Sequence, residues 1–190
     1  MLDVFPHVVI WRGDFYANRP IVALVASTSP MRLDPAAVAA RASALARGIG
    51  ADAALAAILP YYAGNLGQAR DVVPDGPINT DGRPLIEYLS PVAQWSGDSA
   101  SSPWFVSMPL VRFFGQLRAA APLDQDPYLT LLTEPQRGYV QAGTLYHRAV
   151  VQSLRGDEAA AQADLAEALR RLPERVDVSG PFMALEPVVR

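Results

Sequence analysis

The sequence predicts an α+β fold that is mostly helical, with a β-hairpin near the N-terminus and helices after it. Two observations carry this prediction. Apolar residues occupy most positions of residues 7–11 and 20–26, as in strands, and a turn-rich segment separates the two runs. From residue 107 onward, apolar residues recur at helical spacing between capping residues and prolines. Because 51% of the 190 residues are hydrophobic, the chain can bury a globular core.

The second predicted strand, residues 20–26, is apolar at consecutive positions. Such a strand is usually buried on both faces in the middle of a sheet. A hairpin alone cannot provide that burial, and the rest of the sequence shows no further central strand. We therefore predict that the hairpin is the edge or last pair of a larger sheet that begins before this sequence. Exposure of residues 21–26 in the isolated chain would then drive self-association.

Start and stop signals divide the remaining sequence into helices. Asp34 followed by Pro35 predicts a helix over residues 36–47 that ends at Gly48. Thr133 and Gln136 match a capping box at the start of a long helix. The other helices are expected at 51–59, from Tyr62 to about Asp71, and at 107–120, 127–132 and 158–172, the last with Ala161, Leu165, Ala168 and Leu172 on one face.

A segment rich in serine, residues 96–103, is the best candidate for a boundary within the chain. It divides the sequence into residues 1–95, which hold the hairpin and the first helices, and residues 104–190, which form a helical tail. We expect two units joined by this linker.

Composition excludes several classes of function. A net charge of −3 and no basic cluster argue against nucleic-acid binding. The absence of cysteine excludes disulfides, thiolate zinc sites and a thiol nucleophile. His7 and His147 lie far apart without carboxylates at metal-ligand spacing, so no metal site is expected. No apolar run approaches the roughly 20 residues of a membrane span, and the N-terminus does not resemble a signal peptide. We expect a cytoplasmic protein.

The segment 77–91 concentrates polar residues that shape a turn. Asn79, Thr80 and Asp81 can bond nearby backbone, and Gly82 allows a positive φ. Pro84 holds Arg83 in an extended conformation, and Glu87 lies in an alternating stretch after it.

Three carboxylates are the strongest candidates for ligand binding: Asp14, Asp81 and Glu87, each in a constrained loop beside aromatic residues. Desolvated carboxylates beside aromatic rings suit a cationic amine. The alternative for each alone is structural: a loop aspartate that bonds its own backbone, or a local ion pair of Arg83 with Asp81 or Glu87. Taken singly, each residue favours the structural interpretation.

Residues 139–173 resemble a single tetratricopeptide unit. Gly156 lies at the turn, and Ala161, Leu165 and Ala168 occupy packing positions of the second helix. Repeats of this kind need about three copies for a stable solenoid, and the sequence contains one. An antiparallel helix pair that packs on its own domain is therefore the favoured interpretation over a peptide-binding groove.

Three segments together resemble a known family. Residues 5–15 (FPHVVIWRGDF), 20–25 (PIVALV) and 77–91 (PINTDGRPLIEYLSP) are similar to the C-terminal part of bacterial spermidine synthase-like proteins, particularly those fused to an N-terminal membrane region. The resemblance covers roughly residues 1–91. Members usually have a second aspartate after Asn-Thr-Asp, where this chain has Gly82.

The resemblance implies a class I methyltransferase-like sheet of which the hairpin is the last pair of strands. It also implies aminopropyl transfer from decarboxylated S-adenosylmethionine in the intact family. The nucleotide-binding glycine loop and the catalytic aspartate of that family belong to earlier strands, and none of them is in this chain. What carries over is that the loop joining the last two strands contributes aromatic side chains to the substrate pocket, here Phe15 or Tyr16. Together with Asp14, which its chemistry suggests, they are the expected substrate-binding residues.

We therefore expect the C-terminal portion of a spermidine synthase-like protein, without catalysis or a cofactor of its own. Its expected partner is the missing N-terminal domain, another protein or a second copy. The alternative is a non-catalytic interaction module that uses its tetratricopeptide-like tail. An unrelated small enzyme lacks a supporting set of residues.

Overall fold

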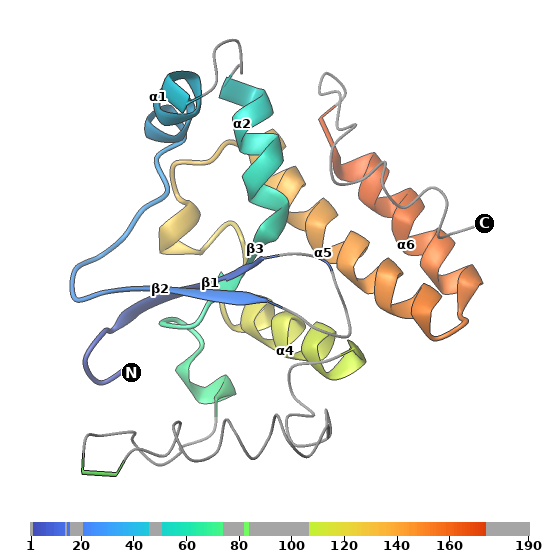
Figure 1. Ribbon diagram of the computed structural model, residues 1–190, viewed down its shortest axis with the longest axis horizontal. Coiled ribbons are helices and arrows are strands. Elements are labelled where there is room, and N and C mark those ends of the chain that lie inside the picture. Colours follow the sequence, from blue (N-terminus) through green and yellow to red (C-terminus); the bar gives the residue numbers. More distant parts are fainter. Residues whose placement is uncertain are drawn as a thin grey trace.

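The computed structural model describes residues 2–13, 15, 21–45, 51–73, 82–83 and 107–173. Within these ranges the chain forms a small antiparallel sheet surrounded by helices, which confirms the predicted mostly helical α+β class. Figure 1 shows α2 and α5 above the sheet, α4 below it, and α6 alongside α5. The predicted linker at 96–103 lies outside the described residues.

The sheet has three strands in the order β2-β1-β3. The predicted hairpin is confirmed: β1 (His7–Arg12) pairs antiparallel with β2 (Val22–Ser27), and His7 is opposite Ser27. β3 (Tyr62–Asn65) pairs antiparallel with the other side of β1, with a shift in register between Ile10 and Trp11. β1 is therefore the central strand, and β2 is an edge strand.

β3 corrects two predictions. The expected helix from Tyr62 to Asp71 is wrong, because residues 62–65 form a strand, followed by a turn and a short 3-10 helix at Arg70–Val72. The prediction that no central strand accompanies the hairpin needs correction in one respect: β3 pairs with β1 and makes β1 itself the central strand. Gly64 has a φ of 156°, which glycine adopts readily and other residues avoid, so a helix is interrupted there.

The first helices follow the predicted signals closely. α1 (Pro35–Leu45) begins where the Asp34 carboxylate accepts hydrogen bonds from the backbone N–H of Ala36 at 2.9 Å and of Ala37 at 3.3 Å. α2 (Ala51–Ile58) continues into a 3-10 turn, Leu59–Tyr61, that leads directly into β3. The predicted stop at Gly48 lies outside the described residues.

The C-terminal helices also begin at their predicted caps. α4 covers Ser107–Ala120, and a 3-10 turn, Pro127–Leu129, replaces the longer helix predicted there. α5 (Glu134–Leu154) begins with the Thr133–Gln136 capping box. α6 (Glu158–Arg171) is capped by Asp157, and it packs along α5 as the predicted helix pair (Figure 1). Ala161 and Ala168 are fully buried on its inner face, as predicted.

Two hydrophobic cores lie on opposite faces of the sheet. Val9 points into one with Leu55, Leu59 and residues of α5, and its neighbours Val8 and Ile10 point into the other, toward α4. This alternation is that of a central strand with both faces covered. Residues from before and after the predicted linker pack together in both cores. None of the described helices has the length and apolar character that a bilayer crossing requires.

Candidate functional site

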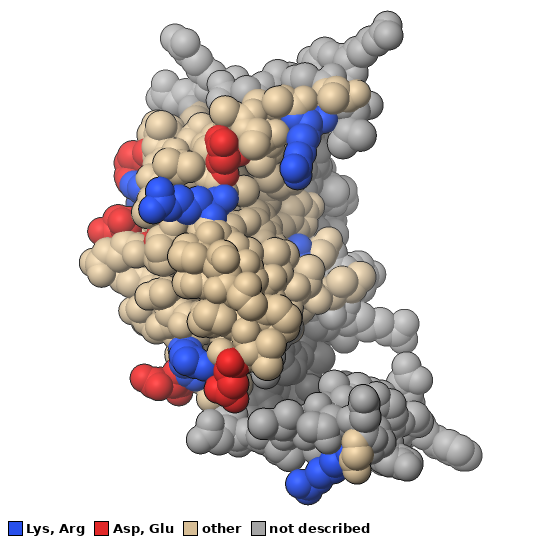
Figure 2. Space-filling view, turned by 90° about the vertical axis from the view of Figure 1, so that its left-hand side faces the viewer, with Lys and Arg blue, Asp and Glu red and all other residues tan. Residues whose placement is uncertain are grey.

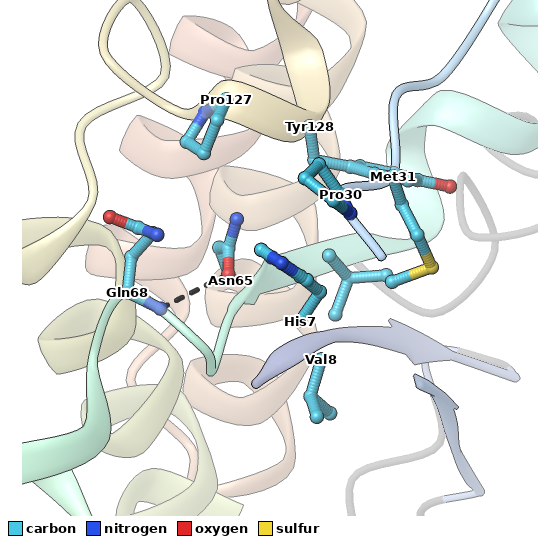
Figure 3. A pocket seen from close by; sticks show the side chains of 9 residues that line it. His7, Val8, Pro30, Met31, Asn65, Gln68, Pro127 and Tyr128 are labelled. Carbon is cyan, nitrogen blue, oxygen red and sulfur yellow. Dashed lines mark hydrogen bonds between the residues drawn. The ribbon is translucent and has the colours of Figure 1, made fainter. Parts of the chain in front are cut away.

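A small cavity opens where the start of β1 meets the connection from β2 to α1 and the 3-10 turn at Pro127. Its volume is about 220 Å³, and Figure 3 shows its walls. The lining residues are His7, Val8, Val9, Pro30, Met31, Asn65, Gln68, Pro127 and Tyr128. The His7 side chain reaches from β1 toward the middle of this group, and the Asn65 and Gln68 side chains lie on one side of it.

The buried carboxylate of Asp126 connects residues near the cavity wall by hydrogen bonds. Asp126 is 1% exposed and accepts three hydrogen bonds. The donors are Tyr62 Oη at 2.6 Å, Asn65 Nδ2 at 2.7 Å and the Tyr128 backbone N–H at 3.0 Å. Hydrogen bonds to an ionised acceptor are strong, and a buried carboxylate without them would be very costly. Asp126 therefore fixes both β3 and the 3-10 turn.

Contacts between aromatic rings hold Tyr128, which lines the cavity, in place. Tyr62 and Tyr128 are stacked with their ring centroids 5.6 Å apart, and Trp11 meets Tyr62 edge-on at 5.2 Å. Burial, followed by the negative charge of Asp126, raises the pKa of Tyr62, so its hydroxyl stays protonated and donates. The wall is therefore preorganised.

The polar groups of this cavity suit binding more than chemistry. Asn65 uses its Nδ2 on Asp126, and its Oδ1 accepts from the Gln68 backbone N–H at 3.2 Å. Both Asp126 oxygens are occupied by donors. Within the described ranges no group of three histidine or acidic residues could hold a metal ion. The arrangement can take a small, largely apolar molecule against Met31 and Tyr128.

Arg12 is the second unusual group, at the other end of β1. Its side chain is buried, and its Nη2 donates to the backbone carbonyls of Pro60 at 2.9 Å and Tyr62 at 3.1 Å. The guanidinium carbon lies 5.5 Å from the ring centroids of both Phe15 and Phe114. Nε and Nη1 are buried, and neither has a hydrogen-bond partner among the described residues. Cation–π contacts with the two rings offset part of that cost.

His147 shares this interior. Its ring lies 5.8 Å from that of Phe114 on α4. Burial, reinforced by repulsion from Arg12, lowers the pKa of His147 to about 3. The imidazole is therefore neutral at physiological pH, and it acts here as a packing residue.

The predicted site residues fall in different places. Phe15 is described, and it packs at 4.8 Å against the rings of both Tyr61 and Tyr146, so it belongs to the interior around Arg12. Arg83 is described and exposed. The remaining predicted residues lie outside the described ranges: Asp14, Tyr16, Asn79, Thr80, Asp81 and Glu87. The predicted amine site stays a prediction.

Sequence reasoning missed the residues that carry the polar structure of the interior. Asp126, Arg12 and Asn65 were not singled out as site residues. The one signal in the sequence is Asp126-Pro127-Tyr128, a capping aspartate beside an aromatic residue, which does not reveal its distant partners.

β2 is the most exposed apolar element near the N-terminus. Leu24 is 48% exposed, Val25 42%, and the preceding Ile21 62%. The strand has no charged residue and no proline, and β1 is its one neighbour in the described sheet. Figure 2 shows the side of the molecule along which the β2–α1 connection runs, where a broad uncharged band separates two groups of charged side chains.

Comparisons of the chain with known protein families, with curated proteins and with solved structures found no match.

Proposed function

We propose that the chain is the non-catalytic C-terminal portion of a spermidine synthase-like protein, and that the free edge of β2 joins it to a strand of the remaining sheet. One observation carries the proposal: an uncharged strand, Val22–Ser27, stands at the edge of the sheet with aliphatic side chains exposed. Natural edge strands are normally protected by charges, prolines or bulges. β2 has neither charge nor proline.

The family resemblance supports this occupant of the edge. It implies that the hairpin is the last pair of strands in a larger sheet, so a further strand beside β2 is expected. β1 already has both neighbours, β2 and β3, which leaves β2 as the place where pairing can extend. A fourth strand, beside β2, would cover part of Leu24 and Val25, which are exposed in the described residues.

A photo-crosslinking amino acid in place of Leu24 tests the proposal in cells that make the natural protein. We expect a crosslink to a polypeptide segment, in the same chain or another, that carries a glycine-rich strand–turn–helix. A matched probe replaces Leu169 of α6, which is 52% exposed, and should not reach that segment. Crosslinks from position 24 to a second copy of the same segment, or to no protein, would contradict the proposal.

Calorimetry with methylthioadenosine tests the non-catalytic part separately. The purified chain should bind none, because the nucleotide-binding motif of the family is not in this sequence. Clear saturable binding would show that the chain has a cofactor pocket of its own, whatever the crosslinking result.

The alternative is a protein-interaction module that uses the α5–α6 pair. Leu154 is 54% exposed and Leu169 52%. Leu154 ends α5 beside the turn, whereas Leu169 lies near the far end of α6, so the two do not form one patch. Single exposed leucines are common on protein surfaces. A specific crosslink from position 169 to another protein, without one from position 24, would favour this alternative.

A further inference from the structure

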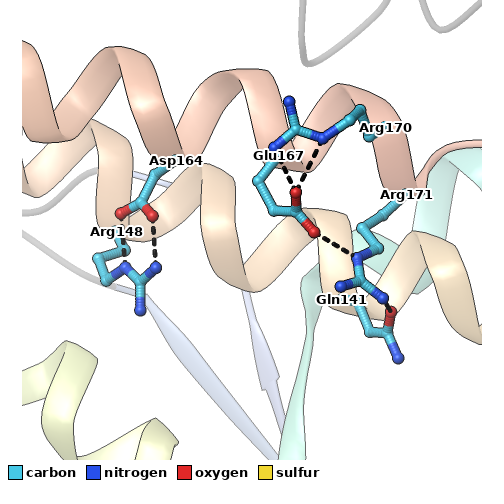
Figure 4. A network of polar contacts seen from close by, with 6 residues as sticks. All are labelled: Gln141, Arg148, Asp164, Glu167, Arg170 and Arg171. Carbon is cyan, nitrogen blue, oxygen red and sulfur yellow. Dashed lines mark hydrogen bonds and ion pairs between the residues drawn. The ribbon is translucent and has the colours of Figure 1, made fainter.

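A second hollow, of about 350 Å³, opens between the end of α4 and the α5–α6 pair. Its lining residues are Arg118, Leu123, Gln141, Thr144, Leu145, Glu167 and Arg171. Figure 4 shows three of these residues: Arg171 lies between Glu167, also of α6, and Gln141 of α5. The hollow thus combines two arginines with two leucines.

Arg118 enters this hollow without a direct counter-ion. Its Nη2 donates to the Tyr62 carbonyl at 2.8 Å and its Nε to the Ala63 carbonyl at 3.4 Å. In the described part of the chain no carboxylate forms an ion pair with it. A guanidinium held in place by backbone carbonyls is a fixed positive charge with little rotamer freedom to lose on binding.

A second positive charge lies close behind it. Arg12 Nη2 also donates to the Tyr62 carbonyl, at 3.1 Å, so two guanidinium groups meet at one oxygen. Burial, followed by repulsion from Arg118, lowers the pKa of Arg12. Asp126 attracts the Arg118 guanidinium through its charge, but its hydrogen bonds go to Tyr62, Asn65 and Tyr128, not to either arginine. Two guanidinium groups thus face one buried carboxylate. The interior around Tyr62 therefore favours an additional anion.

On the opposite wall the lining residues Glu167 and Arg171 form an ion pair, and Arg170, which does not line the hollow, also pairs with Glu167. Glu167 accepts from Arg170 and, at 2.7 Å, from Arg171 Nε, so two cations surround one carboxylate. Arg171 Nη1 contacts Gln141 Oε1 at 3.3 Å, which turns its guanidinium toward α5. The Arg171 guanidinium therefore already binds one carboxylate, that of Glu167.

We propose that this hollow binds a small aliphatic monocarboxylate, with Arg118 and Arg171 as the residues that recognise the anion. Leu123 and Leu145 supply the apolar contact for the aliphatic part. The Thr144 hydroxyl donates to the Val140 carbonyl at 3.1 Å, so its proton is not available to the anion. Glu167 in the same wall disfavours a dianion such as phosphate, whereas a single carboxylate matches the geometry of a guanidinium. The site is separate from the β2 edge and does not depend on the function proposed for that edge.

NMR titration of the full chain with 4-methylpentanoate tests the proposal. We expect saturable shifts of the backbone amides at residues 118, 141–145 and 171. The neutral 4-methylpentanamide has the same shape without the charge and should cause none at equal concentration, and neither should inorganic phosphate. Equal shifts with the amide, or shifts spread over all exposed arginines, would overturn the proposal.

Two substitutions with opposite expected signs sharpen the test. Arg171→Gln should weaken 4-methylpentanoate binding by about tenfold, the effect of one charge-assisted hydrogen bond. Glu167→Gln should tighten it, because a repelling charge is removed. Arg155→Gln changes an exposed arginine outside the hollow and serves as the matched control. Wild-type affinity in the Arg171 variant, or weaker binding in the Glu167 variant, would contradict the assignment.

Discussion

β2 and β3 flank the same strand, yet the more apolar of the two is the more exposed. β2 has the sequence VALVAS, and its middle three residues are exposed. β3 has the sequence YAGN, and all four of its residues are buried. Both pair antiparallel with β1. Apolar content therefore does not decide which strand lies inside.

The difference lies in what covers each strand. α4, α5 and the Asp126 turn pack against β3, and its polar groups are bound by Asp126, Arg12 and Arg118. The described residues place no element against the outer edge of β2. A polar strand can be buried when every polar group has a partner, whereas an apolar strand is exposed where none of the described elements packs against it.

Removing the Asp126 carboxylate should cause the largest loss. Asp126→Ala leaves the Tyr62 hydroxyl and the Asn65 amide buried without their acceptor, so the free energy of unfolding should fall by about 3 kcal/mol. Urea unfolding followed by circular dichroism measures it. Asp124→Ala, at an exposed position two residues earlier, should change it by less than about 0.5 kcal/mol. Equal losses in the two variants would show that β3 does not depend on Asp126.

Lowering the pH should cause the next largest loss of stability, through His147 of α5. His147 has a folded pKa of about 3 against an ordinary 6.5, so the unfolded chain takes up a proton that the folded chain does not. The stability from neutral His147 is complete above pH 6.5 and decreases as the pH falls toward 3. The slope is up to about 1.4 kcal/mol per pH unit.

Urea unfolding of the wild type and of His147→Phe between pH 7 and pH 4.5 measures this dependence. The wild type should lose more stability than the variant, which has no proton to take up. Parallel curves for the wild type and His147→Phe would refute the assignment.

Adding a methyl group to Gly64 of β3 should lower the free energy of unfolding by a smaller amount, about 2 kcal/mol. In Gly64→Ala the new Cβ would lie 2.9 Å from Leu117 Cβ, at a φ of 156°. Thermal unfolding should show a lower midpoint. Gly115→Ala, where the Cβ meets open space on α4, should instead stabilise the chain by about 0.5–1 kcal/mol. A neutral Gly64→Ala would mean that β3 is packed less tightly than the contact with Leu117 requires.

A charge on β2 should change stability least. Leu24→Lys places the charge at a position that is 48% exposed. The free energy of unfolding should therefore change by less than about 0.5 kcal/mol. Concentration-dependent association of the purified chain, measured by analytical ultracentrifugation, should decrease because a charged edge resists pairing. Leu169→Lys on α6 should leave association unchanged. A wild-type chain that stays monomeric at all concentrations would contradict exposed-edge pairing.

Local signals allowed most helix boundaries to be predicted. Asp34, Thr133 and Asp157 each bond the backbone two or three residues on, so the information lies within one turn of the chain. β3 could not be predicted this way. Tyr62 and Asn65 bond Asp126 across 64 and 61 residues, and Gly64 is constrained by Leu117 of a later helix. Neither relation leaves a pattern in the sequence around residue 62.

The candidate site was predicted less well than the fold. Arg12 lies in the segment that resembles spermidine synthase-like proteins, but its burial follows from Phe15, Phe114 and the Pro60 carbonyl, which meet only in three dimensions. The apolar character of β2 was predicted correctly, and β2 is an edge strand of the described sheet, whereas the larger sheet stays a prediction. The prediction failed on β1, because four residues at Tyr62–Asn65 suffice to complete its other edge.

The distance along the chain between β3 and Asp126 affects synthesis. A ribosome releases β1, β2 and Tyr62 well before the aspartate that binds the Tyr62 hydroxyl. During translation the N-terminal sheet is therefore incomplete. Its aliphatic strand, β2, is then available to chaperones that bind nascent chains. Arrested nascent chains that expose residues up to 120 should be degraded readily by protease, and those that expose α5 as well should resist it.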